Sequence, residues 1–321
     1  MRAVFQTGYG SPDAFEIREV PTPVAKNDQV LIRVRAAALH AGDVFMMRGV
    51  PYFTRLVVGF PKPRGYVPGY DVAGVVEAVG KNVNRFAPED EVFGSLAHTC
   101  AEFVCTSERE LEEKPANLSL EQAAAVPTSA IAALHGIRDA AKVKAGMHVL
   151  INGASGGVGT FAVQIAKAYG AEVTGVCSTR NVDLVRSIGA DHVIDYTQED
   201  FTRGGTRYDV ILDQVANHPL RACRRALTPT GVHIPNSGHK GMPYIIKATL
   251  VSIFVRRQGG TYHAAPKPGD LSELKGLIES GKVSPVIDRT HKLEEISEAF
   301  RHLDAGHARG KVVIAIEDRS S

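Results

Sequence analysis

The stretch VLINGASGGVGTFAVQIAKAYGAEVTGVCSTR, from Val149 to Arg180, constrains the fold of this 321-residue chain more than any other feature. Its apolar runs at 148–152 and 172–177 predict two buried strands, and the amphipathic spacing over 156–170 predicts a helix between them. Small residues at the first junction let backbone N–H groups approach a phosphate at the positive end of the helix dipole. The stretch therefore predicts a βαβ unit that binds a dinucleotide. The alternative is a tight strand-to-helix turn without a ligand.

The glycine-rich turn follows the G-x-G-x-x-G pattern with one change, because its three positions hold Ala154, Gly156 and Gly159. A glycine pattern alone is weak evidence, but this one lies between a predicted strand and a predicted helix. We expect the cofactor to contact five residues of the turn: Ala154, Ser155, Gly156, Gly157 and Val158.

The end of the second predicted strand carries no acidic residue. A site for NAD places Asp or Glu there, to accept hydrogen bonds from the ribose hydroxyls. This chain has Ser178 and then Arg180, which can donate to a 2′-phosphate and pair with it. Tyr196 closes the third predicted strand and can reach the same end of the nucleotide. The pattern predicts NADP(H). The alternatives are a solvated surface charge for Arg180 and strand-end packing for Tyr196.

The pattern of predicted elements differs between the first third of the chain and the rest. In the first third, short β-branched runs such as QVLIRVRAAAL are bounded by turn residues, which favours a compact, mostly antiparallel β unit. Beyond about residue 120, strands and helices alternate, which favours a parallel sheet with helices on both faces. The chain closes with a predicted helix and strand, and that strand can return to the N-terminal β unit.

Composition is typical of soluble globular proteins, with 44% hydrophobic and 22% charged residues. A net charge of +2 gives no reason to expect a nucleic-acid or membrane-surface partner. The most apolar window, residues 245–255, is too short to span a bilayer. The N-terminus lacks the apolar core of a signal peptide, and the four cysteines show no CxxC spacing. We expect a cytoplasmic protein without a disulfide framework.

The order of these elements, together with NGASGGVG, GADHVIDY and the closing GKVVIAI, resembles the medium-chain dehydrogenase/reductase superfamily. The likeness is strongest to its zinc-independent quinone oxidoreductase branch, which includes zeta-crystallin, and covers essentially the whole chain. It implies an α/β fold with a GroES-like, β-rich catalytic domain made of residues 1–122 and 263–321. A Rossmann domain with a doubly wound parallel sheet would then span residues 123–262. The resemblance also implies a homodimer, or less often a tetramer.

Zinc-dependent members of this superfamily build their catalytic site with a Cys and with a His-Glu pair after a glycine. In the matching segments this chain has His40, in HAGD, and Tyr70, in GYD. One imidazole and one carboxylate do not complete a three-ligand catalytic zinc site, and the four closely spaced cysteines of the structural zinc lobe are absent. The resemblance therefore implies no zinc. It disfavours alcohol oxidation, which needs a Lewis acid to stabilise an alkoxide.

Without a metal, the expected reaction is hydride transfer from NADPH to a quinone or to the β-carbon of an α,β-unsaturated carbonyl compound. The protein then has to align this small-molecule acceptor and donate hydrogen bonds to the oxygen on which charge develops. Two catalytic candidates are His40, where the branch often has Asn, and Tyr52, which matches a tyrosine near the substrate. The alternatives are a satisfied buried histidine and a tyrosine packed at the rim of the cleft. Asp43 is expected to orient its neighbours rather than to transfer protons.

The resemblance implies further cofactor contacts. Thr128, in VPTSA, matches the helix that approaches the nicotinamide, with a simple helix cap as the alternative. Val215, Asn236 and Gly238 follow strands whose C-terminal ends face the cofactor in this fold. Lys311, in GKVVI, also matches the superfamily, but a charge at the edge of a strand is the better interpretation of it.

Two other functions stay open. An enoyl-thioester reductase would use similar chemistry on an acyl-CoA or acyl-carrier substrate, and it would need a basic entrance. The sequence offers scattered candidates for such an entrance: Arg55, Lys62, Arg64, Arg256 and Arg257. A non-catalytic protein that binds NADPH would keep the same cofactor loop.

Overall fold

The computed structural model describes residues 1–236, 250–251, 259 and 265–317. Gly238, Arg256 and Arg257 lie outside the described residues, as does the window 245–255 apart from Leu250 and Val251. The chain divides into two compact units, of which unit 1 contains residues 1–129, 266–279 and 285–321, and unit 2 contains residues 130–265 and 280–284.

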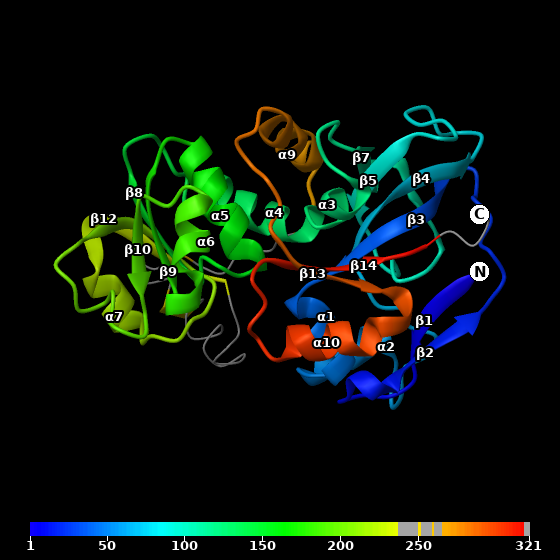
Figure 1. Ribbon diagram of the computed structural model, residues 1–321, viewed down its shortest axis with the longest axis horizontal. Helices are drawn as coiled ribbons and strands as arrows, with labels where there is room; N and C mark the ends of the chain where they lie inside the picture. The colour runs from blue at the N-terminus through cyan, green and yellow to red at the C-terminus, as the bar shows by residue number, and fades with distance from the viewer. Residues whose placement is uncertain (237–249, 252–258, 260–264, 318–321) are drawn as a thin grey trace. The chain divides into compact units, whose positions relative to one another are not determined.

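Unit 1 consists of a two-stranded sheet, a larger mixed sheet and short helices (Figure 1). Its strands are β1 (Arg2–Gln6), β2 (Phe15–Glu19), β3 (Gln29–Leu39), β4 (Asp71–Val79), β5 (Glu91–Ser95), β6 (Phe103–Ser107), β7 (Leu111–Glu113), β13 (Ile287–Lys292) and β14 (Lys311–Ala315). Its helices are η1 (Pro12–Ala14), α1 (Ala41–Arg48), η2 (Tyr52–Thr54), α2 (Arg55–Val58), η3 (Glu108–Glu110), α3 (Leu120–Ala124), α9 (Asp270–Glu279), η6 (Leu293–Glu295) and α10 (Ile296–Asp304).

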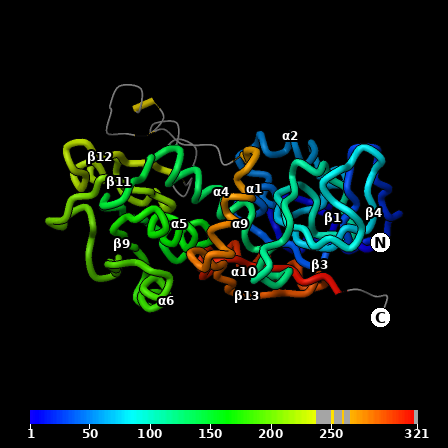
Figure 2. The backbone as a smooth tube through the Cα atoms, turned by 90° about the horizontal axis from the view of Figure 1, so that it is seen from above, coloured from blue at the N-terminus to red at the C-terminus, as the bar shows by residue number. Residues whose placement is uncertain are grey.

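The β-branched strand β3 is the centre of unit 1, because it pairs antiparallel with β4, β6 and β14. The C-terminal strand does return to the N-terminal β unit, as the sequence predicted, with Val312 opposite Leu39. Figures 1 and 2 show this C-terminal segment beside β3. Side chains such as Ile32, Phe300 and Ile314 form one buried core beneath the sheet. The predicted antiparallel character is confirmed, apart from the parallel pair β13–β14.

Unit 2 is a five-stranded sheet in which every pair is parallel, in the order β10-β9-β8-β11-β12. Its strands are β8 (His148–Asn152), β9 (Glu172–Cys177), β10 (His192–Asp195), β11 (Tyr208–Asp213) and β12 (Leu227–Pro235). Its helices are η4 (His135–Ala140), α5 (Gly157–Ala168), η5 (Thr179–Asn181), α6 (Val182–Ser187) and α7 (Leu220–Arg225), and the chain enters unit 2 within α4 (Pro127–Leu134).

Helices cover both faces of the parallel sheet. A Cβ on Gly175 would meet Val185 of α6, whereas the next residue, Val176, packs in a cluster with Cys223 of α7. Because successive residues of a strand point to opposite faces, α6 and α7 lie on opposite sides. The strand order reverses between β8 and β11, so the predicted doubly wound fold is confirmed, and ligands of such sheets bind at that reversal.

Within the part of the chain that the structure describes, no helix combines the length and apolar character needed to cross a bilayer.

Candidate functional site

The glycine-rich turn enters α5 at Gly157 through a tightly constrained backbone. Gly153 adopts a φ of +86°, and both Gly153 and Ala154 donate their N–H groups to the carbonyl of Val176 in β9. A Cβ on Gly159 would lie 2.0 Å from the carbonyl oxygen of Gly153, so this position requires glycine. No side chain caps the first turn of α5, which leaves its N–H groups to a ligand with negative charge. The turn has the geometry of a phosphate cradle.

Asn181 ties this turn to the end of β9, and the sequence analysis missed it. Its amide Nδ2 donates to Ser155 Oγ at 2.9 Å and to Ser178 Oγ at 3.3 Å. The side chain is nearly enclosed, with its Oδ1 atom buried and without a hydrogen-bond partner. Because both serine oxygens accept from the amide, each hydroxyl proton remains for donation to a ligand oxygen. The structure thus brings the predicted Ser155 and Ser178 into one polar cluster.

Arg180 and Tyr196 follow the carboxyl ends of two neighbouring strands, β9 and β10. Arg180 is exposed in η5, two residues after Ser178. Tyr196 is exposed after β10, and its N–H donates to the carbonyl of Cys177 at 3.0 Å. A guanidinium, two hydroxyl donors and an uncapped helix start are the groups that bind phosphates in proteins. These residues therefore fit a phosphorylated dinucleotide.

Asp195, the last residue of β10, is an acid that the sequence analysis did not place at this edge. Its carboxylate accepts hydrogen bonds from Thr179 Oγ1 at 2.6 Å, from Thr197 N at 3.0 Å and from Gln198 Nε2 at 2.8 Å. The hydroxyl of Thr179 is the main reason why the pKa of Asp195 lies below its usual range. The carboxylate is thus engaged in holding the turn that carries Arg180. A signal for it existed in the sequence, since Asp195 precedes Tyr196 in VIDY.

The ends of β8 and β11, where the strand order reverses, are joined by a buried network around Asp213. Asn152 Nδ2 donates to Asp213 Oδ1 at 2.7 Å, and His233 Nε2 lies 3.2 Å from Asp213 Oδ2. The N–H of Ala216 donates to the same carboxylate at 2.8 Å. Burial alone would raise the pKa of Asp213, but these hydrogen bonds, with His233 foremost, outweigh it and lower the pKa. The network fixes the backbone at the reversal.

Two predicted contact residues belong to this junction. A Cβ on Gly153 would lie 2.8 Å from Val215 Cγ2, so Val215 is adjacent to the glycine-rich turn. Asn236 donates its N–H to the carbonyl of Asp213 at 2.8 Å, and its Nδ2 donates to Gln214 Oε1 at 3.2 Å. Both therefore lie at the same strand ends as the phosphate cradle.

Asp213, Cys223 and His233 bring potential metal-ligand atoms within 4.8 Å of one another. The Asp213 carboxylate already accepts hydrogen bonds from the side chain of Asn152 and from two backbone N–H groups, those of Val215 and Ala216. Its oxygens are thus satisfied by the protein itself, and the cluster is explained as part of the network at the reversal.

In unit 1, His40 is held at the start of α1. Its Nδ1 accepts the N–H of Gly42 at 2.8 Å, and its ring stacks on Tyr70 with centroids 5.4 Å apart. Because Nδ1 acts as the acceptor, the proton of a neutral imidazole sits on Nε2, which can donate to a ligand oxygen. Asp43 accepts the N–H of His40 at 2.9 Å and that of Gly69 at 3.1 Å. Asp43 therefore orients its neighbours, in agreement with its predicted role.

Lys311 is not at a strand edge, and that interpretation was wrong. The side chain is 1% exposed, and its Nζ lies 2.9 Å from Asp71 Oδ2 and 3.2 Å from Ser129 Oγ. The other oxygen of Asp71 accepts the N–H of Thr128 at 2.8 Å, and Thr128 Oγ1 lies 3.1 Å from Ser95 Oγ. Because β14 is an interior strand between β13 and β3, its first side chain is enclosed. A buried ion pair therefore positions Thr128 at the start of α4.

Tyr52 lies on η2 and is 73% exposed. The guanidinium of Arg55 covers its ring at 4.7 Å and the ring of Tyr9 at 4.5 Å. This cation–π stack fixes the direction of Tyr52 without occupying its hydroxyl.

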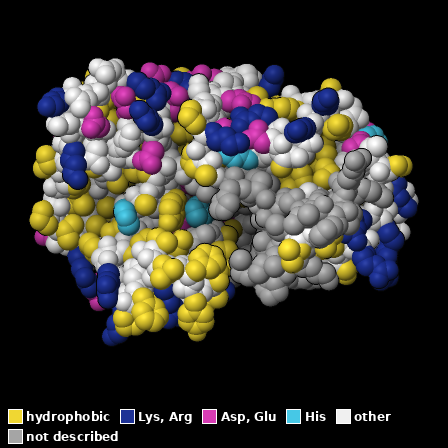
Figure 3. All heavy atoms as spheres, turned by 180° about the vertical axis from the view of Figure 1, so that it is seen from behind, with side chains coloured by type: hydrophobic (Ala, Val, Ile, Leu, Met, Phe, Trp, Pro, Cys, Tyr) yellow, Lys and Arg dark blue, Asp and Glu magenta, His cyan; other side chains and the backbone are white. Residues whose placement is uncertain are grey.

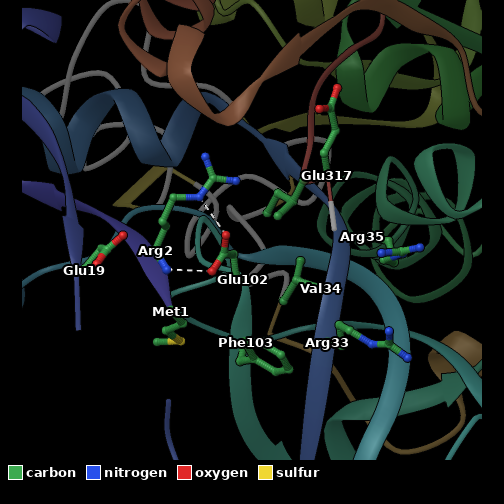
Figure 4. A pocket seen from close by; sticks show the side chains of 10 residues that line it. Met1, Arg2, Glu19, Arg33, Val34, Arg35, Glu102, Phe103 and Glu317 are labelled. Atoms are coloured by element: carbon green, nitrogen blue, oxygen red, sulfur yellow. Dashed lines mark hydrogen bonds and ion pairs between the residues drawn. The ribbon is translucent and has the colours of Figure 1, made fainter. Parts of the chain in front are cut away.

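A pocket of about 420 Å³ in unit 1 contains none of the predicted site residues (Figure 4). Ion pairs and strand residues of β1 and β3 form its walls, and Arg2 points to Glu102, with Nε and Oε1 2.6 Å apart. These charges neutralise each other, so the pocket gives no reason to relocate the site.

Comparison with known families matches two models to this chain. Residues 26–176 match the alcohol dehydrogenase GroES-like domain, and residues 188–314 match a model described as zinc-binding dehydrogenase.

Relatives and solved structures agree over almost the whole length. The chain is 30% identical to a chloroplast envelope quinone oxidoreductase homolog of Arabidopsis thaliana, over 98% of each chain. It is 33% identical to the NADPH-dependent alkenal/one oxidoreductase of the same plant, over 98% of this chain and 79% of the relative. The quinone oxidoreductase structure from Coxiella burnetii superposes with a TM-score of 0.88 at 30% identity, covering 99% of each chain.

Proposed function

The chain belongs to the medium-chain dehydrogenase/reductase superfamily and is an oxidoreductase with a nicotinamide cofactor, and we propose that it uses NADPH to reduce quinones or α,β-unsaturated carbonyl compounds. The observation that carries the proposal is the polar cluster of Ser155, Asn181 and Ser178, with Arg180 directly beside it. When bound, the nicotinamide supplies the hydride.

The preference for NADPH over NADH rests on the charges at the nucleotide edge. Arg180 and two hydroxyl donors favour the 2′-phosphate. Asp195, the acid at this edge, is committed to Thr179, Thr197 and Gln198. Its oxygens therefore compete poorly for ribose hydroxyls.

His40 supports the reduction by donating a hydrogen bond from Nε2 to the acceptor oxygen. Charge develops on that oxygen as the carbonyl or quinone is reduced, and a positioned donor stabilises it. The cap formed with Gly42 holds the ring in the donor tautomer, and Asp43 fixes the backbone beneath it. Tyr52 offers a second hydroxyl donor, which its stack on Arg55 keeps in place.

We propose that the reaction needs no zinc, because the donor set at His40 does not suit the metal. The imidazole Nδ1 is used by Gly42, the Asp43 oxygens are used by backbone N–H groups, and a tyrosine stands at position 70. Activity should survive dialysis against a chelator, and metal analysis of the active protein should find less zinc than protein.

An assay of NADPH and NADH oxidation in parallel tests the proposal. The acceptors are a benzoquinone, phenanthrenequinone, cyclohexenone, an aliphatic enal and crotonyl-CoA. Turnover with quinones or enones and a preference for NADPH supports the proposal. Turnover with crotonyl-CoA alone would favour the enoyl-thioester reductase, and tight NADPH binding without any turnover would favour the non-catalytic binding protein. The homodimer and the cytoplasmic location stay predictions.

A further inference from the structure

Large apolar side chains are exposed together at one place in unit 1. Ten such residues are exposed in the described part of the chain, and seven of them fall between positions 45 and 60. We call residues 45–60 the apolar tip, and its exposed members are Phe45, Val50, Tyr52, Phe53, Leu56, Val57 and Phe60. Figure 3 shows hydrophobic side chains gathered at the lower left of that view, with Lys and Arg side chains beside them. Exposed apolar clusters of this kind mark interaction surfaces.

The apolar tip is an ordered turn with an inner and an outer side. Thr54 and Val58 are buried, and the hydroxyl of Thr54 donates to the carbonyl of Pro51 at 2.9 Å. Leu56 and Val57, which lie between Thr54 and Val58 in the sequence, are 83% and 64% exposed. Phe53, in η2, and Phe60, just beyond the end of α2 at Gly59, are exposed as well, so four large apolar side chains of this turn face solvent.

Basic residues surround the apolar tip. The segment 44–70 contains Arg48, Arg55, Lys62 and Arg64 and no Asp or Glu. Lys62 and Arg64 are exposed, and Arg55 is held between Tyr9 and Tyr52, at the base of the tip. Arg48 is paired with Asp304, with Nη2 and Oδ1 2.7 Å apart. The net charge of the chain is small, but the segment 44–70 that forms this surface is basic.

The charge distribution disfavours a second copy of the chain as the partner that covers the apolar tip. A twofold contact would bring the same patch of both copies together, and Arg55, Lys62 and Arg64 would face their own equivalents. A bilayer that contains anionic lipid matches both properties, because it accepts apolar side chains and attracts the surrounding cations.

We propose that the apolar tip attaches the protein to the surface of an anionic lipid bilayer. Phe53, Leu56, Val57 and Phe60 enter the boundary between headgroups and acyl chains, while Lys62 and Arg64 contact the lipid phosphates. This attachment is peripheral and reversible, and it revises the expectation of no membrane partner that whole-chain charge gave. It goes beyond the proposed function and does not depend on it, because binding is measured without an acceptor.

The chain has no tryptophan, so a single introduced tryptophan reports on one position. The test uses the full-length Leu56→Trp protein with two kinds of vesicle, one of phosphatidylcholine alone and one that also contains phosphatidylserine. Val24→Trp is the matched control, because Val24 is 84% exposed and lies outside the apolar tip. We expect a blue shift of emission for Leu56→Trp with the anionic vesicles and none for Val24→Trp. Circular dichroism spectra and urea midpoints that match the wild type confirm that both variants fold.

Sedimentation with the same vesicles measures the fraction of protein bound to lipid. The variants compared lack either two apolar side chains of the tip or two of its positive charges. Phe53→Ser combined with Leu56→Ser should reduce the bound fraction about tenfold or more, since two large apolar groups no longer leave water. Lys62→Glu with Arg64→Glu should abolish the preference for phosphatidylserine, and Val24→Ser should bind like the wild type. Equal shifts with both vesicles, or no shift with either, would overturn the proposal. So would self-association that is lost in the serine variant without lipid.

Discussion

At the scale of single residues, two exposed arginines near the nucleotide edge allow a matched comparison. Arg180 follows Ser178 in η5, whereas Arg186 lies on α6, with Nη1 3.9 Å from Asp183 Oδ1. Arg180→Ala should raise the KM for NADPH about tenfold, because a charge-assisted hydrogen bond contributes about 1.5–3 kcal/mol. The KM for NADH should not change, since NADH lacks the 2′-phosphate. Steady-state kinetics with both cofactors measure the effect.

Arg186→Ala serves as the control, with unchanged KM for both cofactors. An equal loss for NADPH and NADH in Arg180→Ala would show that the arginine supports the turn rather than the 2′-phosphate. The preference proposed here would then need another source.

The buried pair of Lys311 and Asp71 gives a second prediction at this scale. Lys311→Met should lower the free energy of unfolding by about 3–5 kcal/mol, because it leaves the Asp71 carboxylate buried without its partner charge. The double change Asp71→Asn with Lys311→Met should recover part of that loss. Urea denaturation of the three proteins measures it, and a loss below about 1 kcal/mol for Lys311→Met would mean that water reaches the carboxylate.

At the scale of elements, the junction of β8 and α5 contains two glycines with different surroundings. A Cβ on Gly159 would lie 2.0 Å from the carbonyl oxygen of Gly153, but a Cβ on Gly156 would meet the same atom at an ordinary 3.5 Å. Gly159→Ala should therefore distort the turn and weaken NADPH binding by about tenfold or more, as expected when a phosphate loses several N–H donors. Gly156→Ala should bind NADPH more tightly than Gly159→Ala, as measured by isothermal titration. The reverse order would rule out the close approach as the cause.

This junction could be predicted because the residues that shape it are neighbours in the sequence. Asn181 was missed because its partner Ser155 is 26 residues away, and only the pairing of strands brings the two together. Lys311 was misinterpreted for the same reason, because its partner Asp71 is 240 residues away. The residues around Lys311 in the sequence do not show which strands pair with β14. Local spacing thus predicted the cradle, whereas the polar groups that complete it depend on strand order and register.

The Asp213 network links β8, β11 and β12, and its pH dependence follows from the lowered pKa. Because the folded-state pKa is depressed, the stabilisation is complete above the ordinary Asp pKa of about 3.9 and is lost as the pH falls through the folded-state value. Asp213→Asn should therefore be less stable than the wild type at pH about 7, and the difference should narrow below pH about 4. Urea midpoints across this range measure it, and a constant difference would exclude the carboxylate's charge as the cause.

At the scale of the whole molecule, the two units contain different parts of the proposed site. Unit 2 contains the phosphate cradle and the polar groups at its edge, while unit 1 contains His40, Tyr52 and the apolar tip. Unit 1 is discontinuous in sequence, because its sheet is completed by β13 and β14 from the C-terminal part of the chain. The folding of unit 1 therefore requires a segment that is made after the whole of unit 2.

Truncation after Gly310 tests this requirement. It removes β14, which lies between β13 and β3, and with it the buried side chains of Lys311, Val312 and Ile314. β13 loses the strand that it pairs with, β3 loses one of its three partner strands, and Asp71 loses its counter-charge. We expect unit 1 to lose cooperative unfolding, as seen by far-ultraviolet circular dichroism during urea denaturation. Truncation after Glu317 keeps β14 and should unfold like the intact chain, and a wild-type midpoint for the shorter protein would show that β3 does not need its C-terminal partner.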